Sequence, residues 1–275
     1  MTLATRRRSY WLIFMLSVLI LVADVTLSLP LFSKAFNLAA LRDGAATSTW
    51  TAFGLSVGSW ILGPVGAIIL SSFATATLFA ILVSFRKTAS EEIYFLAFWA
   101  LSCSFESGRI VVERLVEGGF PPAWMALTTR VVLAARFSGY GAFFLAGLRS
   151  AGFRNERPGR AVLAAIGLGI AAASALPIDS GAFEPTYLVR AAYQTERLFL
   201  VAALALITAA NLLVAVETTG EKVFRSVAIG ALALLAGQAL LILGWRPEIL
   251  LAGILLLAFG ARLFVSQLHS HYLWQ

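Results

Sequence analysis

Apolar stretches long enough to cross a lipid bilayer as helices dominate this sequence. A hydrocarbon core about 30 Å thick needs about 20 apolar residues per helix. Eight stretches reach that length, and the segments between them carry Arg, Pro or Gly and are short except for residues 32–59. We expect these spans at residues 10–31, 60–85, 93–115, 123–148, 161–178, 188–216, 226–244 and 249–267. The predicted fold is therefore all-α, a polytopic membrane bundle forming one domain over residues 1–275.

The composition excludes most other classes of protein. Of the 275 residues, 60% are apolar and 13% are charged, which is about half the charged share of a soluble domain. A disordered chain, a basic nucleic-acid-binding domain and nearly all soluble enzymes are excluded. We interpret the net charge of +7 as basic loops lying against an anionic lipid leaflet, so the expected partner is the lipid bilayer.

The first span follows a basic start, Arg6-Arg7-Arg8, and its apolar run continues to about Pro30. No A-x-A cleavage site follows it, so we expect residues 10–31 to form an uncleaved signal-anchor helix. Seven further spans then occupy residues 60–267.

Loop charges predict the orientation of the bundle. With the N-terminus inside, eleven basic loop residues lie inside and four outside, as the positive-inside rule requires. The inside group is Arg6, Arg7, Arg8, Arg86, Lys87, Arg149, Arg154, Arg157, Arg160, Lys222 and Arg225, and the outside group is Lys34, Arg42, Arg114 and Arg246. Both termini are therefore predicted to be cytoplasmic. Abundant Ala and Arg with only three Lys favour a bacterial inner membrane as the location.

Motifs for catalysis or cofactor binding give little support to an enzyme. The segment 54–58 matches G-x-S-x-G, but the only histidines, His269 and His271, are predicted on the opposite side of the bilayer. Asp24 is the only aspartate within a span, and an aspartyl protease needs two. No lysine lies within a span to hold retinal, and His and Cys are too few for a zinc site. We expect no cofactor, no metal and no catalytic residue.

Charged residues inside the spans are the informative feature. Each costs about 2.5–3.5 kcal/mol near the bilayer centre on insertion scales, so they must face the bundle interior or a wet cavity. They fall in spans three, four and six and comprise Glu106, Arg109, Glu113, Arg130, Arg136, Arg190, Glu196 and Arg197. Most of them are predicted at a common depth in the outer half of the membrane, which indicates a single site.

Helical spacing refines this site. Glu106 and Arg109 share one helical stripe, and Arg136 shares a face with Tyr140. Arg130 and Arg136 are six residues apart, about 120° around the helix, so both cannot point at one centre. The charges sum to about +2, which favours an anion, because Arg binds carboxylate and phosphate in bidentate fashion. The candidate ligand-binding residues are Glu106, Arg109, Arg130, Arg136, Tyr140, Tyr193, Glu196 and Arg197.

Four hypotheses about the function remain open. The leading one is a receptor-like or sensory protein that binds an anionic ligand or lipid headgroup in an outward-facing pocket and signals through a partner protein. A small secondary transporter of an anion, with proton or ion coupling through Glu106 or Glu196, is the alternative. Arg–Glu pairs that only lock the bundle, as in a structural subunit of a larger complex, give a third. A lipid-modifying enzyme ranks last, because a glutamate flanked by arginines is a poor general acid.

Overall fold

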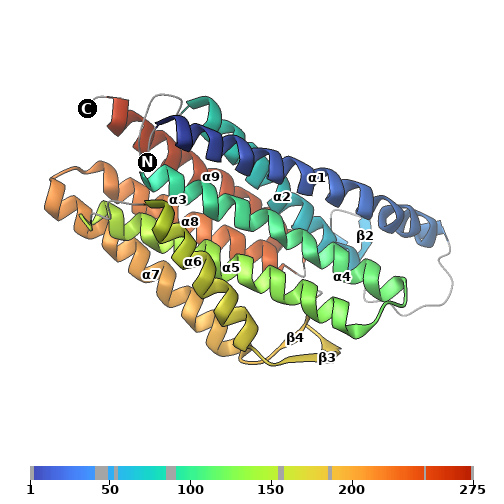
Figure 1. Ribbon diagram of the computed structural model, residues 1–275. Helices are drawn as coiled ribbons and strands as arrows, with labels where there is room; N and C mark the ends of the chain where they lie inside the picture. Colours follow the sequence, from blue (N-terminus) through green and yellow to red (C-terminus); the bar gives the residue numbers. More distant parts are fainter. Residues whose placement is uncertain are drawn as a thin grey trace.

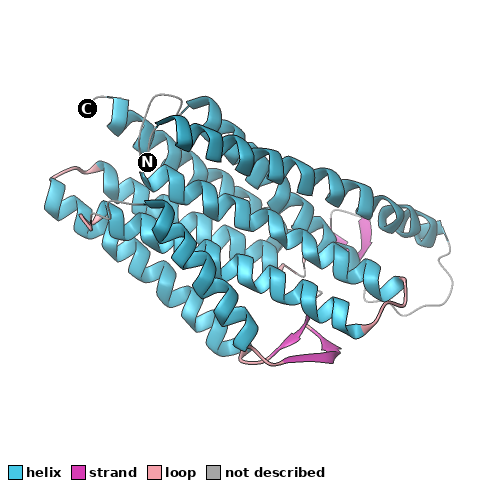
Figure 2. Ribbon diagram, in the orientation of Figure 1, coloured by secondary structure: helices cyan, strands magenta, loops and turns pink. Residues whose placement is uncertain are grey.

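The computed structural model describes residues 3–40, 49–52, 55–84, 91–153, 158–184, 188–244 and 246–273. Within these ranges the chain is predominantly helical, with two short β-hairpins (Figure 2). Eight helical stretches of the described chain are long and apolar enough to cross a membrane, as the hydropathy pattern predicts. Several residues used to predict orientation or metal binding lie outside the described part: Arg42, Arg86, Lys87, Arg154, Arg157 and the side chains of Arg6, Lys34, His269 and His271.

The elements follow one another along the chain with short connections. The helices are α1 (Leu3–Ala40), α2 (Ser59–Ser84), α3 (Glu91–Ser104), α4 (Gly108–Glu117), α5 (Pro122–Ser150), α6 (Pro158–Ala175), α7 (Gln194–Thr219), α8 (Val223–Leu243) and α9 (Pro247–Leu273). A 3₁₀ turn, η1 (Phe105–Ser107), joins α3 to α4, and the three together make the third span, Glu91–Glu117. The hairpins are β1 (Thr49–Ala52) with β2 (Leu55–Gly58), and β3 (Ile178–Phe183) with β4 (Val189–Ala191).

The third span and α8 form the interior of the bundle. In the apolar part of the third span 72% of the residues are buried, and in that of α8 the share is 61%. The corresponding share is 22% in α1 and in α7. The outer helices expose large apolar side chains such as Leu12, Leu163 and Phe199. The N- and C-termini lie at the same end of the bundle, and the hairpins lie at the other end (Figure 1).

The sixth span begins later than predicted. Residues 189–191 were expected inside the span, but they form strand β4, which pairs with β3 in antiparallel fashion. Val189 and Ala191 are buried while Arg190 between them is exposed, which is the alternation of a half-buried strand. Tyr193 then adopts a left-handed conformation, with φ 61°, and α7 starts at Gln194. The prediction that Arg190 belongs to a membrane helix is therefore wrong.

Helices α8 and α9 pack through small residues. A Cβ added at Gly260 would lie 2.7 Å from the Gly230 carbonyl oxygen and 2.8 Å from the Leu234 nitrogen. At Gly237 the backbone of α9 is equally close, with the Gly253 oxygen 2.9 Å away. The two helix backbones therefore approach each other at positions where no side chain fits.

The substitution Gly260→Val is expected to lower the free energy of unfolding by about 1–3 kcal/mol, because α8 and α9 must separate to admit the side chain. Gly167→Val on α6 is the matched control, since a Cβ there meets nothing within 4 Å. Thermal unfolding of the purified protein in detergent measures both. Equal unfolding midpoints for the two variants would show that this contact does not hold the helices together.

Candidate functional site

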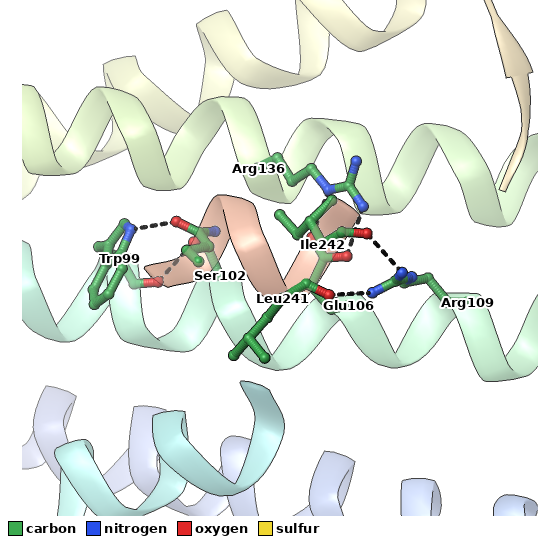
Figure 3. A network of polar contacts seen from close by, with 8 residues as sticks. Trp99, Ser102, Glu106, Arg109, Arg136, Leu241 and Ile242 are labelled. Carbon is green, nitrogen blue, oxygen red and sulfur yellow. Dashed lines mark hydrogen bonds and ion pairs between the residues drawn. The ribbon is translucent and has the colours of Figure 1, made fainter. Parts of the chain in front are cut away.

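Arg136 and Glu106 form the central ion pair of the bundle (Figure 3). Arg136 Nε donates to Glu106 Oε1 over 2.5 Å, and Nη2 donates to Oε2 over 2.6 Å. Glu106 is completely buried, and the Arg136 side chain is 11% exposed. This is the bidentate geometry in which a guanidinium and a carboxylate bind most strongly.

The local sequence explains why these two helices meet at this point. Glu106 lies on η1, where the third span tightens into a 3₁₀ turn. Gly108 follows the turn, and a Cβ added there would clash with the Val132 side chain of α5. The missing side chain therefore lets α5 approach the turn, and Arg136, one helical turn beyond Val132, reaches Glu106.

Arg109 lies one turn beyond Glu106 but has different partners. Its Nη2 donates to the Ile242 carbonyl oxygen over 2.9 Å, and Nη1 is 3.5 Å from the Leu241 oxygen (Figure 3). These carbonyls belong to the last turn of α8, where no helical N–H remains to pair with them. Arg109 is 1% exposed. It therefore caps α8 from inside the bundle, a role that the helical stripe alone did not predict.

A second ion pair joins α7 to the β3–β4 hairpin. Arg197 Nη2 donates to Glu184 Oε1 over 2.6 Å and to the Ala191 carbonyl oxygen over 3.0 Å. The same Glu184 oxygen accepts the Ala191 N–H, at 3.2 Å. Glu184 is 8% exposed. Sequence reasoning missed it, because it falls in a connection between two spans and follows no helical periodicity.

Three of the predicted residues do not join this group. Arg130 and Glu196 are exposed, and Tyr193 is 60% exposed. Arg130 lies on the outer face of α5, as its six-residue separation from Arg136 implies. Tyr193 precedes the first turn of α7, and its left-handed backbone accompanies a side chain at the surface.

Both ion pairs border one cavity between α5, α7 and α8. Its volume is about 80 Å³, enough for a few water molecules or a small organic group. Polar lining comes from Arg136, Tyr140, Glu184, Gln194 and Arg197. The rest is apolar, from Leu133, Phe137, Leu198, Val201, Ala239, Ile242 and Leu243.

Two polar groups at this cavity have no hydrogen-bond partner in the described part of the chain. Tyr140 is only 6% exposed, and its hydroxyl makes no hydrogen bond there. Arg136 uses Nε and Nη2 for Glu106, which leaves Nη1 without a bond to a described residue. A nearly buried hydroxyl and a guanidinium edge that lack partners among the described residues favour a bound water or ligand.

The charge at the cavity differs from the predicted surplus. Arg136 and Arg197 are matched by Glu106 and Glu184, so the two ion pairs are neutral together. The other arginines of the predicted cluster are exposed or, in the case of Arg109, bonded to α8 carbonyls. These two ion pairs therefore carry no excess positive charge that would attract an anion.

The sequence identified Glu106, Arg136, Tyr140 and Arg197 of this arrangement by their polarity inside apolar spans. No comparable signal marks the apolar cavity wall or Glu184. Comparison with protein-family models, with characterised proteins and with solved structures finds no match to this chain.

Proposed function

We propose that this chain is a multi-pass membrane protein that binds a small molecule with an apolar body and one acidic group in the cavity between α5, α7 and α8. The observation that carries this proposal is the Tyr140 hydroxyl, which lines the cavity without a hydrogen-bond partner among the described residues. The exposed apolar faces of the outer helices support a bilayer as the surroundings. With cytoplasmic termini, the cavity lies in the outer half of the membrane.

The cavity chemistry supports a carboxylate or phosphate as the acidic group. Arg136 has five N–H donors and gives two of them to Glu106. An acidic group beside Nη1 and the Tyr140 hydroxyl would accept one charge-assisted and one neutral hydrogen bond. The predominantly apolar lining suits an alkyl or aryl body and disfavours a strongly hydrated inorganic anion.

A receptor-like role is the first form of this proposal. Helix α5 continues past the cavity, and the first turns of α7 and the last turn of α8 complete its wall, so no interrupted helix of the described chain borders it, which supports a fixed pocket rather than one that opens alternately to both sides. Signalling would then need a partner protein. The bacterial inner membrane remains the proposed location.

A transporter is the second candidate, and one observation favours it. The third span is interrupted by η1 at Glu106, and interrupted helices are typical of transporter binding sites. Uptake of radiolabelled hexanoate into liposomes that contain the protein separates the two forms. Uptake above that of empty liposomes would favour transport, and binding without uptake would favour a receptor.

The substitution Tyr140→Phe is expected to weaken hexanoate binding about 10-fold or more, because a hydrogen bond to a charged group contributes about 1.5–3 kcal/mol. Hexanoate carries an alkyl body and one carboxylate, and isothermal titration calorimetry measures its affinity. Tyr193→Phe is the matched control, since that hydroxyl lies on an exposed side chain outside the cavity lining. If both variants bind like the wild type, Tyr140 does not contact the ligand.

A further inference from the structure

Asp24 is a carboxyl group enclosed in the first span, 1% exposed. Helix α1 packs against α2, α3, η1 and α4. Helix α2 has no charged residue, and the others carry Glu91, Glu92, Glu106, Arg109, Glu113, Arg114 and Glu117. On α1 itself, the nearest charged residues are Lys34 and Arg8, ten and sixteen positions away.

No cation from the described residues bonds to Asp24. Arg109 donates to carbonyl oxygens of α8, and Arg114 donates to the Leu27 carbonyl oxygen and to Glu117. The hydrogen bond described for the Asp24 side chain joins Oδ2 to Ser71 Oγ, 2.5 Å apart. An ionised carboxylate in an apolar interior with one neutral partner is very unfavourable, so such a group takes up a proton instead.

The single hydroxyl proton of Ser71 also indicates that Asp24 is protonated. Ser71 Oγ also lies 3.3 Å from the Ser104 carbonyl oxygen. A serine hydroxyl has one proton, so it makes one full hydrogen bond as a donor. Both contacts are complete hydrogen bonds only if Asp24 donates its own proton to Ser71 Oγ and Ser71 donates to Ser104.

The Ser104 carbonyl lies at the end of α3, where the backbone hydrogen bonds change from the α to the 3₁₀ pattern. In a continuous α-helix it would accept the Gly108 N–H. At η1 that N–H bonds instead to the carbonyls of Phe105 and Glu106. In the 3₁₀ pattern the Ser104 oxygen pairs with an N–H three residues along the chain, and its second lone pair accepts the Ser71 hydroxyl.

The neighbouring hydroxyls donate their hydrogen bonds to groups other than Asp24. Thr75 Oγ1 donates to the Ser71 carbonyl oxygen over 2.9 Å. Ser17 Oγ, 2.8 Å from Thr75 Oγ1, must then donate to it, and Ser104 Oγ donates to Ser17 over 2.9 Å. This chain of hydroxyls is complete without a contact to Asp24, so it offers no further donors to a carboxylate.

We propose that Asp24 is a proton-binding site, a carboxyl group that holds a proton at neutral pH in the folded protein and donates it to Ser71. This proposal does not depend on the ligand of the cavity. Loss of the proton would turn the Ser71 hydroxyl toward the carboxylate and release the Ser104 carbonyl. Proton occupancy is thereby linked to η1, the turn that carries Glu106.

Infrared difference spectroscopy of the wild type against Asp24→Asn, at neutral pH in detergent, tests the site. The asparagine amide keeps a donor toward Ser71, so the variant resembles the protonated acid. We expect the carbonyl band of a protonated carboxylic acid in the wild type and its loss in the variant. A difference confined to carboxylate bands, or no difference, would overturn the proposal.

Two further variants keep the test decisive if Asp24→Asn does not fold. Ser71→Ala removes the partner of the acid, and we expect the same carbonyl band to shift to higher frequency. Asp179→Asn is the control, because Asp179 is exposed and accepts the Gly181 N–H in the hairpin, and its loss is expected to change carboxylate bands only. A wild-type spectrum without an acid band, or an acid band insensitive to Ser71→Ala, would refute protonated Asp24.

Discussion

The substitution Arg136→Gln is expected to lower the free energy of unfolding by about 3–5 kcal/mol, because it leaves Glu106 as an uncompensated buried charge. Glu106 is completely buried and receives two hydrogen bonds from Arg136. Thermal and denaturant unfolding in detergent measure the loss. Arg130→Gln is the matched control, since Arg130 is an exposed residue of the same helix. Equal stability of the two variants would show that the buried pair does not hold α5 against the third span.

Replacing both partners separates stability from ligand binding. The double variant Glu106→Leu with Arg136→Met leaves no buried charge, so its stability is expected to lie within about 1 kcal/mol of the wild type or above it. Hexanoate binding is expected to be lost, because the cavity then lacks the guanidinium donor. A folded double variant that binds hexanoate as tightly as the wild type would remove Arg136 from the site.

The second large effect is expected from Arg109→Met, at about 2–4 kcal/mol of unfolding free energy. The side chain satisfies the carbonyl oxygens of Leu241 and Ile242 at the end of α8, and each buried acceptor left without a partner costs about 1–3 kcal/mol. Amide hydrogen exchange is expected to speed up in the last turn of α8.

The control for this effect is Arg190→Met, because Arg190 is exposed on strand β4. It should leave both the unfolding free energy and the exchange rates of α8 unchanged. Similar losses in the two variants would mean that burial of Arg109 contributes nothing beyond a general effect of removing a charge.

The helical framework was predictable because hydropathy is a local property. The apolar stretches that form the eight membrane-length helices were identified from the chain alone. The hairpin β3–β4 was not, because Val189 and Ala191 are apolar enough to resemble the start of a membrane helix. Only their pairing with β3 distinguishes a strand there.

The site was predictable in its residue types but not in its pairing. Helical phase shows which residues share a face, and it placed Glu106 with Arg109. It does not show which neighbouring helix that face meets, so the pairing of Glu106 with Arg136 and the capping of α8 by Arg109 required the fold. Glu184 lies in a connection, where no periodicity exists to reveal its direction.

Binding in the cavity between α5, α7 and α8 is tested most directly with 6-bromohexanoate, whose bromine can be located by anomalous scattering in crystals of the protein. We expect one bromine position beside the apolar wall of Leu133, Phe137 and Val201, with the carboxylate next to Arg136 Nη1 and the Tyr140 hydroxyl. Bromine bound only elsewhere, or a cavity that stays free of it at saturating concentration, would contradict a ligand site there.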